Sequence, residues 1–130
     1  MGKDWWGKGE GGPGSWGKTA KRTRGVEYQE FVTRMERGTE YQVNGVDFDG
    51  YDATRRVLLD AKDWKGYPPS GAAFWHEGVL KEIDGQLRAA GETPIEWHFS
   101  TEVAKRKVDA MLKKESLEGV IRTVTTPFEL

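Results

Sequence analysis

Carboxylates and a lysine gather in two neighbouring segments of the chain, and these residue types could do chemistry together. Asp47 and Asp49 are two residues apart, as are Asp60 and Lys62. Because side chains two residues apart in a β-strand lie on the same face, each pair shares a face. Two carboxylates brought close together repel each other unless a cation lies between them. Such oxygen ligands suit Mg2+ or Mn2+, and an adjacent lysine can orient a water molecule or stabilise charge on a phosphate.

The turn between these two segments decides which carboxylates face each other. In a hairpin, a two-residue loop places Asp47 opposite Asp60, whereas a four-residue loop at residues 53–56 places Asp49 opposite Asp60. The sequence leaves both registers open. In either register, two carboxylates and a lysine share one face, which is the set of groups needed for metal-assisted hydrolysis of a phosphodiester.

The same residues have a plainer interpretation as a solvated hairpin face. Cross-strand Asp–Lys pairs on such a face are common and contribute little to stability. Residues 57–59 and Ala61 are apolar, however, and a strand that is apolar on both faces is typical of the interior of a sheet. Charges at the end of such a strand favour a functional role, so we keep both interpretations at this stage.

Composition excludes several other chemistries. The chain has 130 residues, enough for one compact domain, with no Cys and 2 His. It therefore has no disulfide scaffold, no cysteine zinc site and no thiol nucleophile. No stretch approaches the roughly 18 to 20 apolar residues of a membrane span. Any catalysis must therefore depend on carboxylates, lysines, arginines and hydroxyl groups.

Charge is unevenly distributed along the chain. The formal net charge is -1, but residues 1–25 hold six basic and two acidic side chains, or +4, which leaves -5 for residues 26–130. Residues 1–25 are also rich in glycine and contain Trp5, Trp6 and Trp16. We expect an arm or linker over residues 1–25, either flexible or docked through its tryptophans. An acidic body would not coat DNA through bulk charge, so contact with nucleic acid would be local and assisted by bound cations.

Hydrophobic periodicity predicts helices that alternate with a run of short strands. The spacing of apolar residues indicates helices over 26–37 and 72–90, and a third helix that begins near Ser100 or Thr101. Alternating or β-branched runs indicate strands at 41–43, 46–51, 57–62, 95–99 and 120–125, and Asn44-Gly45 is a turn signal. This order predicts an α/β fold in which a mixed sheet is flanked by helices.

Two further polar or aromatic residues are weaker candidates for contact with a substrate. Gln86 is predicted on the outward face of the second helix, as a solvated residue or a phosphate contact. Trp64 follows Lys62 closely, and either stacks on bases or packs under the neighbouring loop.

Several short motifs together resemble the PD-(D/E)xK nucleases, which have the restriction-endonuclease-like fold. More narrowly, the chain resembles the fifth family of restriction-endonuclease-fold toxin domains, found in bacterial polymorphic and type VI secretion effectors. The matching motifs are Tyr28-Gln29, Phe48-Asp49-Gly50, Leu59-Asp60-Ala61-Lys62, the strand Glu96–Phe99 and Thr126-Pro127. The resemblance covers about residues 26–128, and Asp60 stands where the family more often has Glu.

The resemblance implies a site and a set of partners. Asp49 and Asp60 would hold Mg2+ (or Mn2+), and Lys62 would position or activate the attacking water. An acidic residue of the first helix commonly completes such sites, and Glu27, at the edge of that helix's apolar face, is the expected one, ahead of Glu30. DNA would be the substrate, and the producing cell would need a cognate immunity protein.

We therefore expect residues 26–130 to form a nuclease toxin domain, a Mg-dependent deoxyribonuclease at the C-terminus of a secreted effector. It would act in the cytoplasm of a target bacterial cell. Two other interpretations remain open: a non-catalytic protein-interaction module on the same fold, and a housekeeping or phage nuclease that acts on RNA or branched DNA. The oligomeric state is not predicted.

Overall fold

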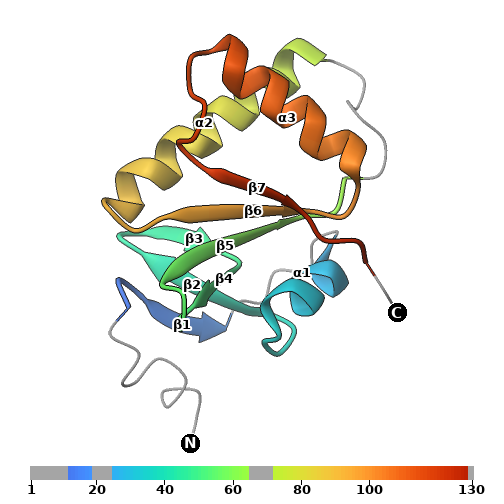
Figure 1. Ribbon diagram of the computed structural model, residues 1–130. Helices are drawn as coiled ribbons and strands as arrows, with labels where there is room; N and C mark the ends of the chain where they lie inside the picture. The colour runs from blue at the N-terminus through green and yellow to red at the C-terminus, as the bar shows by residue number, and fades with distance from the viewer. Residues whose placement is uncertain (1–11, 19–24, 65–71, 129–130) are drawn as a thin grey trace, which may run out of the picture.

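Seven strands and three helices make up the part of the chain that the computed structural model describes, which is residues 12–18, 25–64 and 72–128 (Figure 1). The strands are β1 (Ser15–Lys18), β2 (Thr39–Val43), β3 (Val46–Phe48), β4 (Gly50–Asp52), β5 (Val57–Lys62), β6 (Ile95–Phe99) and β7 (Arg122–Thr125). The helices are α1 (Val26–Thr33), α2 (Ala72–Ala90) and α3 (Glu102–Lys114). The composition of residues 66–71, rich in glycine and proline, predicts a loop there, and these residues lie outside the described part of the chain.

The strands form two sheets. Strands β1, β2 and β3 pair antiparallel in that order. The second sheet has the order β4-β5-β6-β7, in which β4 is antiparallel to β5, whereas β5, β6 and β7 run parallel. In Figure 1, α2 and α3 lie on one side of this mixed sheet and α1 lies on the other, against β4 and β5. The expected α/β architecture of a mixed sheet flanked by helices is confirmed.

The strand expected at residues 46–51 is divided in two at Asp49. The prediction of one continuous strand was wrong because the chain changes sheets there: β3 pairs with β2, and β4 pairs with β5. The Asp49 side chain takes part in the change, since its Oδ2 accepts a hydrogen bond of 2.7 Å from the backbone N–H of Ala61. The junction between the two sheets therefore carries a carboxylate.

Helix α1 ends earlier than expected. It was predicted to reach Arg37, but its last residue is Thr33, and Arg34 adopts a left-handed conformation with φ 62° and donates its N–H to the carbonyl of Glu30. The Thr33 hydroxyl donates to the carbonyl of Gln29 and accepts from the N–H of Met35. Both features satisfy groups at a helix end and stop the helix four residues before the expected end at Arg37.

Part of the segment expected as an arm is a strand. β1 pairs with β2 over four residues, and the ring of Trp16 meets that of Tyr41 edge to face at 5.0 Å. The backbone N–H of Gly14 donates to the Tyr41 hydroxyl at 2.9 Å. A Cβ on Gly14 would overlap the carbonyl oxygen of Gln42, so this close approach requires glycine. Trp5 and Trp6 lie outside the described residues.

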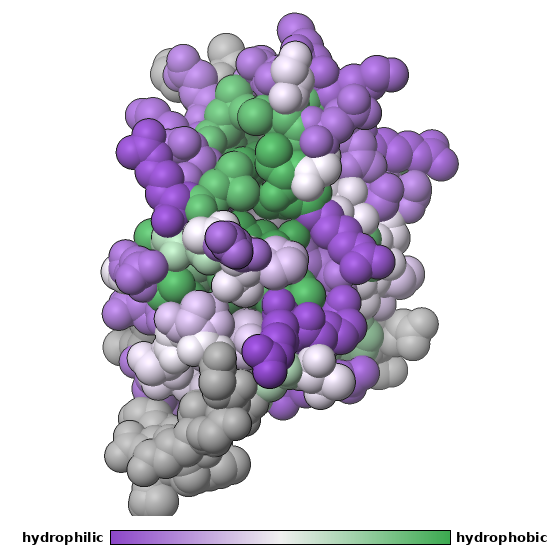
Figure 2. Space-filling view, turned by 60° about the vertical axis from the view of Figure 1, so that its left-hand side comes forward, coloured by the Kyte–Doolittle hydropathy of each residue, from purple (hydrophilic) through white to green (hydrophobic). Residues whose placement is uncertain are grey.

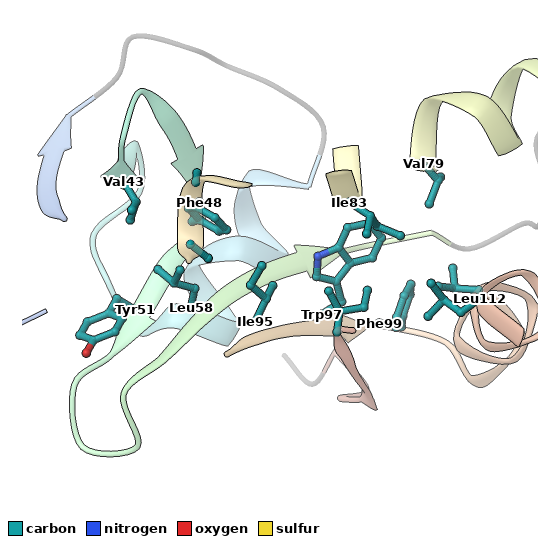
Figure 3. Close-up of a cluster of buried hydrophobic side chains, with 14 of the residues drawn as sticks. Val43, Phe48, Tyr51, Leu58, Val79, Ile83, Ile95, Trp97, Phe99 and Leu112 are labelled. Atoms are coloured by element: carbon teal, nitrogen blue, oxygen red, sulfur yellow. The ribbon is translucent and has the colours of Figure 1, made fainter. Parts of the chain in front are cut away.

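The hydrophobic core joins β5 and β6 to α2 and α3. Figure 3 shows Trp97 and Phe99 of β6 beneath Ile83 of α2, with Leu112 of α3 beside them, and these four side chains are at most 3% exposed. In the side view of Figure 2, hydrophilic residues surround an area of hydrophobic residues in the upper part of that face. None of the helices among the described residues is long and apolar enough to span a membrane.

Strand register divides the polar residues of the mixed sheet between its two faces. Asp60 lies beside Trp97, and Lys62 lies beside Phe99. Because side chains alternate along a strand, Asp60 and Lys62 share the face that carries Trp97 and Phe99, beneath α2. Glu96 is on the opposite face. The two charged residues of β5 therefore point into the layer between the sheet and α2.

Candidate functional site

The hairpin between β4 and β5 has the four-residue turn. Gly50 pairs with Leu59 and Asp52 pairs with Val57, which leaves residues 53–56 as the loop. Continuing this register by one residue places Asp49 opposite Asp60. Of the two registers that the sequence left open, the structure therefore has the second. Asp47 instead lies on the exposed β2–β3 hairpin, where its Oδ1 accepts a hydrogen bond from Gln42 at 2.9 Å.

Asp49 and Asp60 are in contact. Each lies close enough to the other to shift its pKa, and Asp60 is only 6% exposed. Burial and the negative charge of Asp60 raise the pKa of Asp49 well above its ordinary value. Burial also acts to raise the pKa of Asp60, but the Lys62 ammonium and the hydrogen bonds of Asp49 and Gln86 outweigh it and hold that pKa below its ordinary value. The surrounding positive charge therefore favours the charged form of Asp60 but is not sufficient to favour the charged form of Asp49 as well.

Lys62 lies between carboxylates and above an aromatic ring. Its Nζ is 3.2 Å from Oδ2 of Asp60 and 2.8 Å from each carboxylate oxygen of Glu82. The same ammonium lies 4.3 Å from the centre of the Trp97 ring, in a cation–π contact. Lys62 is 8% exposed. A buried ammonium held by two carboxylates has its position closely fixed.

Two residues of α2 complete the surroundings of this group, and sequence reasoning missed both in this role. Glu82 binds Lys62, and Gln86 donates from Nε2 to Oδ2 of Asp60 at 2.6 Å. The expectation that Gln86 faces outward was wrong, because it is 2% exposed and packs over the sheet. The available signal was spacing: residues 82 and 86 are four apart and share a helix face next to the buried Ile83.

Glu27, the acidic residue expected from the first helix, is not among the groups that the structure brings together. Its side chain is 70% exposed, and the ion pair recorded for it is with Arg37 at 3.8 Å. Glu30 likewise pairs with Arg37, at 3.1 Å. The structure thus brings together Asp49, Asp60 and Lys62, with Glu82 of α2 as the nearby third carboxylate.

Gly50 permits the close packing that places Asp49. A Cβ on Gly50 would lie 2.7 Å from Cγ2 and 3.0 Å from Cβ of Thr33 in α1. Real Cβ atoms do not approach other atoms so closely, so α1 can lie against β4 only where the strand has no side chain. This contact gives a structural reason for glycine directly after Asp49.

A second polar cluster lies on the opposite face of the sheet. Arg55 donates two hydrogen bonds to Glu96, at 3.0 and 2.8 Å, and a nitrogen of His98 lies 2.7 Å from the same carboxylate. These contacts, that of Arg55 first, lower the pKa of Glu96 to about 2. The other ring nitrogen of His98 lies 2.7 Å from Oγ1 of Thr126. This cluster ties β6 to the β4–β5 turn and to the segment after β7.

Trp64 packs inward rather than standing free at the surface. Its ring meets those of Trp75, Trp97 and Phe99 edge to face, with centres 5.4 to 6.4 Å apart. Its carbonyl oxygen accepts a hydrogen bond of 2.8 Å from Thr101, the residue that caps α3. Of the two expectations for Trp64, packing is the one that the structure bears out.

The Asp49–Asp60 pair fits a divalent cation. Among the described residues, no group of three or more acidic or histidine side chains already surrounds a common point as a metal site would. The two aspartates nevertheless lie opposite each other at the β4–β5 hairpin, Asp60 is buried, and the charge of Asp60 helps to raise the pKa of Asp49. A hard divalent ion with oxygen ligands relieves the same repulsion.

Comparison with known proteins places the chain in a family. A family model described as restriction endonuclease fold toxin 5 matches residues 25–102, which is more than half of the chain. The matched region contains α1, the hairpin that carries Asp49, Asp60 and Lys62, all of α2, and β6. The chain matches no curated protein.

Proposed function

Because the chain belongs to the restriction endonuclease fold toxin 5 family, we propose that it is a metal-dependent DNA endonuclease that hydrolyses phosphodiester bonds. It would act as the C-terminal toxin domain of a secreted interbacterial effector, with residues 26–130 as the nuclease domain. The observation that carries this proposal is the convergence of Asp49, Asp60 and Lys62 in one buried group at the junction of the two sheets.

Each residue of this group has a distinct role in the proposal. Asp49 and Asp60 hold Mg2+ (or Mn2+), and when bound this ion offsets the charge of the phosphate and makes a water molecule easier to deprotonate. Lys62 orients the attacking water and stabilises negative charge that develops on the phosphate oxygens. Glu82 holds the Lys62 ammonium in place through its two 2.8 Å contacts. Glu27 has no role in the proposal, because its side chain is exposed and its recorded ion pair is with Arg37.

Charge supports a local mode of DNA binding. Residues 26–130 sum to -5, so long-range attraction to a polyanion is weak. A bound divalent ion cancels the two negative charges of the Asp49–Asp60 pair, where the scissile phosphate must lie. We propose that a cognate immunity protein protects the producing cell and that the domain acts in the cytoplasm of a target bacterium.

A digestion assay tests the function. Plasmid DNA, genomic DNA and RNA are each incubated with the wild type, Asp60→Ala and Lys62→Ala, with and without Mg2+. We expect the wild type to cleave DNA only with Mg2+, and each variant to lose at least about 100-fold in rate. Lys81→Ala, which removes an exposed lysine of α2, is the matched control and should retain full activity.

The outcomes separate the proposal from its rivals. Undiminished cleavage by Lys62→Ala would contradict the assignment of the site. Absence of any cleavage by the folded wild type would favour a binding module, and cleavage of RNA alone would overturn the choice of DNA. Expression without its immunity protein should be toxic in a naive bacterial host, and Lys62→Ala should remove that toxicity.

A further inference from the structure

We propose that Gln86 is a positioning residue for Asp60, and that the indole N–H of Trp97 sets the orientation of the Gln86 amide. The inference rests on the proposed function, because it concerns how one expected metal ligand is held. It assigns a role to a buried side chain of α2 and to an aromatic residue of the neighbouring strand.

Three consecutive groups form a short chain of hydrogen bonds. Trp97 Nε1 donates to Oε1 of Gln86 at 2.9 Å, and Gln86 Nε2 donates to Oδ2 of Asp60 at 2.6 Å. Trp97 and Asp60 are themselves neighbours in the β5–β6 register. These two hydrogen bonds thus connect Trp97 of β6, through Gln86 of α2, to Asp60 of β5.

The chemistry of the indole fixes the direction of this chain. An indole N–H can only donate, so the amide atom that faces Trp97 must be the oxygen. The amide NH2 group must then face Asp60. Gln86 is 2% exposed and Trp97 is fully buried, so water does not compete for either bond. In this arrangement a glutamine that could flip its amide group is held in the one orientation that donates to the carboxylate.

The donors determine which oxygen of Asp60 remains for an ion. Gln86 Nε2 and Lys62 Nζ, at 2.6 and 3.2 Å, both approach Oδ2. Because both recorded contacts are with Oδ2, we assign Oδ1 as the oxygen offered to the cation. Partners that orient a metal ligand in this way typically change metal affinity by about 10- to 100-fold when they are removed.

Packing makes the support rigid. The ring of Trp97 lies beneath Ile83, one helical turn from Gln86, and beside Phe99 (Figure 3). Ile83 and Phe99 are at most 1% exposed. Because Gln86 sits on a helix packed against this apolar layer, its amide cannot follow Asp60 if the carboxylate turns. Asp60 is therefore held by a fixed donor rather than by an adaptable one.

Metal binding measured without DNA tests the inference. The dissociation constant of Mn2+ is measured by titration calorimetry for the wild type, Gln86→Met, Trp97→Phe and the double variant, with folding checked by near-UV circular dichroism. Gln86→Met should weaken binding about 10- to 100-fold, and Trp97→Phe should weaken it less. The double variant should bind no worse than Gln86→Met, since both changes break the same chain.

A matched control and the contrary outcomes complete this test. Gln42→Met removes a similar amide–carboxylate bond, to Asp47, on an exposed hairpin and should leave the Mn2+ affinity unchanged. Wild-type affinity in Gln86→Met would overturn the positioning role of Gln86. Losses that simply multiply in the double variant would overturn the coupling of Gln86 to Trp97. Neither outcome would contradict the proposed function. A wild type that binds no divalent ion would overturn the proposed function and this inference with it.

A measurement on the wild type tests the inference even if the variants fail to fold. The indole N–H resonance of Trp97 is followed by NMR while Mg2+ is added. We expect this resonance to shift together with the backbone amide of Ala61, because Gln86 links the indole to the metal ligand. A Trp97 indole that stays unchanged while Ala61 responds would contradict the proposed chain.

Discussion

The ammonium of Lys62 lies 2.8 Å from both carboxylate oxygens of Glu82, a residue twenty positions further along the chain. The two residues come from β5 and α2, elements that are separate in the sequence. Their contact is therefore a product of how α2 packs on the sheet. It places an acidic residue of α2, the helix that follows β5 in the chain, beside the proposed catalytic lysine.

Glu82 and Glu27 are distinguished by their environments, and their variants should differ. Glu82→Gln removes a charge that holds Lys62, so we expect the DNA cleavage rate to fall about 10- to 100-fold. Glu27→Gln changes a side chain that is 70% exposed and should leave the rate within a factor of about two. Initial rates with plasmid DNA and Mg2+ measure both. An equal loss of cleavage rate in the two variants would indicate that Glu27 also belongs to the site.

Replacing Asp49 by Asn should separate stability from activity. Asn keeps an oxygen that can accept the Ala61 N–H and supplies an N–H for Asp60, while it removes the charge that burial and Asp60 disfavour. Without metal at pH 7, the free energy of unfolding should rise by about 1 kcal/mol. DNA cleavage should be lost.

The stability of the wild type and of Asp49→Asn is also compared with and without Mg2+. Mg2+ should raise the melting temperature of the wild type by mass action and should have little effect on Asp49→Asn. The raised pKa of Asp49 gives the pH dependence its sign: the destabilisation that Asn relieves is absent at low pH and grows as the pH rises through the folded pKa. A variant less stable than the wild type at pH 7 would contradict the prediction.

Arg55 should stabilise the fold in a pH-dependent way through Glu96. The pKa of Glu96 falls from its ordinary 4.5 to about 2 in the folded chain. This stabilisation is therefore complete above about pH 4.5 and is lost as the pH falls from there towards 2. Arg55→Ala should lower the free energy of unfolding at pH 7 by about 2 kcal/mol, a figure kept low because the arginine side chain is 44% exposed.

Urea denaturation at pH 7 and pH 3 measures this effect. The deficit of Arg55→Ala should shrink at pH 3, where the Glu96 charge contributes less. Arg88→Ala is the control, because the Arg88–Asp84 pair is 79% and 63% exposed and should matter by less than about 0.5 kcal/mol at either pH. A deficit of the same size at both pH values would show that Arg55 acts through packing alone.

Gly50 should not tolerate a methyl group. In Gly50→Ala the new Cβ would lie 2.7 Å from Cγ2 of Thr33, so we expect a loss of about 1 to 3 kcal/mol in the free energy of unfolding. Thr33→Ser removes that methyl group and should recover part of the loss in the double variant. Gly78→Ala is the control: its Cβ would meet nothing within 4 Å, and alanine in a helix should stabilise by up to about 1 kcal/mol. Thermal unfolding compares all four variants, and a neutral Gly50→Ala would contradict the packing argument.

Local patterns were enough to predict most elements. The apolar residues of α3 recur at helical spacing, and those on its inner face, Ala104, Val108, Met111 and Leu112, are all buried. The strand at 57–62 and the helix at 72–90 have the expected bounds. Both successes depend on periodicities of 2 and 3.6 residues, which are properties of neighbouring residues. The errors fall where the chain changes partners, as at Asp49, or where a cap ends a helix early, as at Arg34.

The sequence by itself determined that Asp60 and Lys62 lie on one face of a strand, because side chains along a strand alternate with a period of two. Only the tertiary structure decided that Asp49 rather than Asp47 faces Asp60, since that depends on whether the turn has two residues or four. It also decided that Glu82 and Gln86 join the group while Glu27 stays at the surface. These outcomes depend on how helices pack against the sheet, and that packing is set by contacts between residues far apart in the chain.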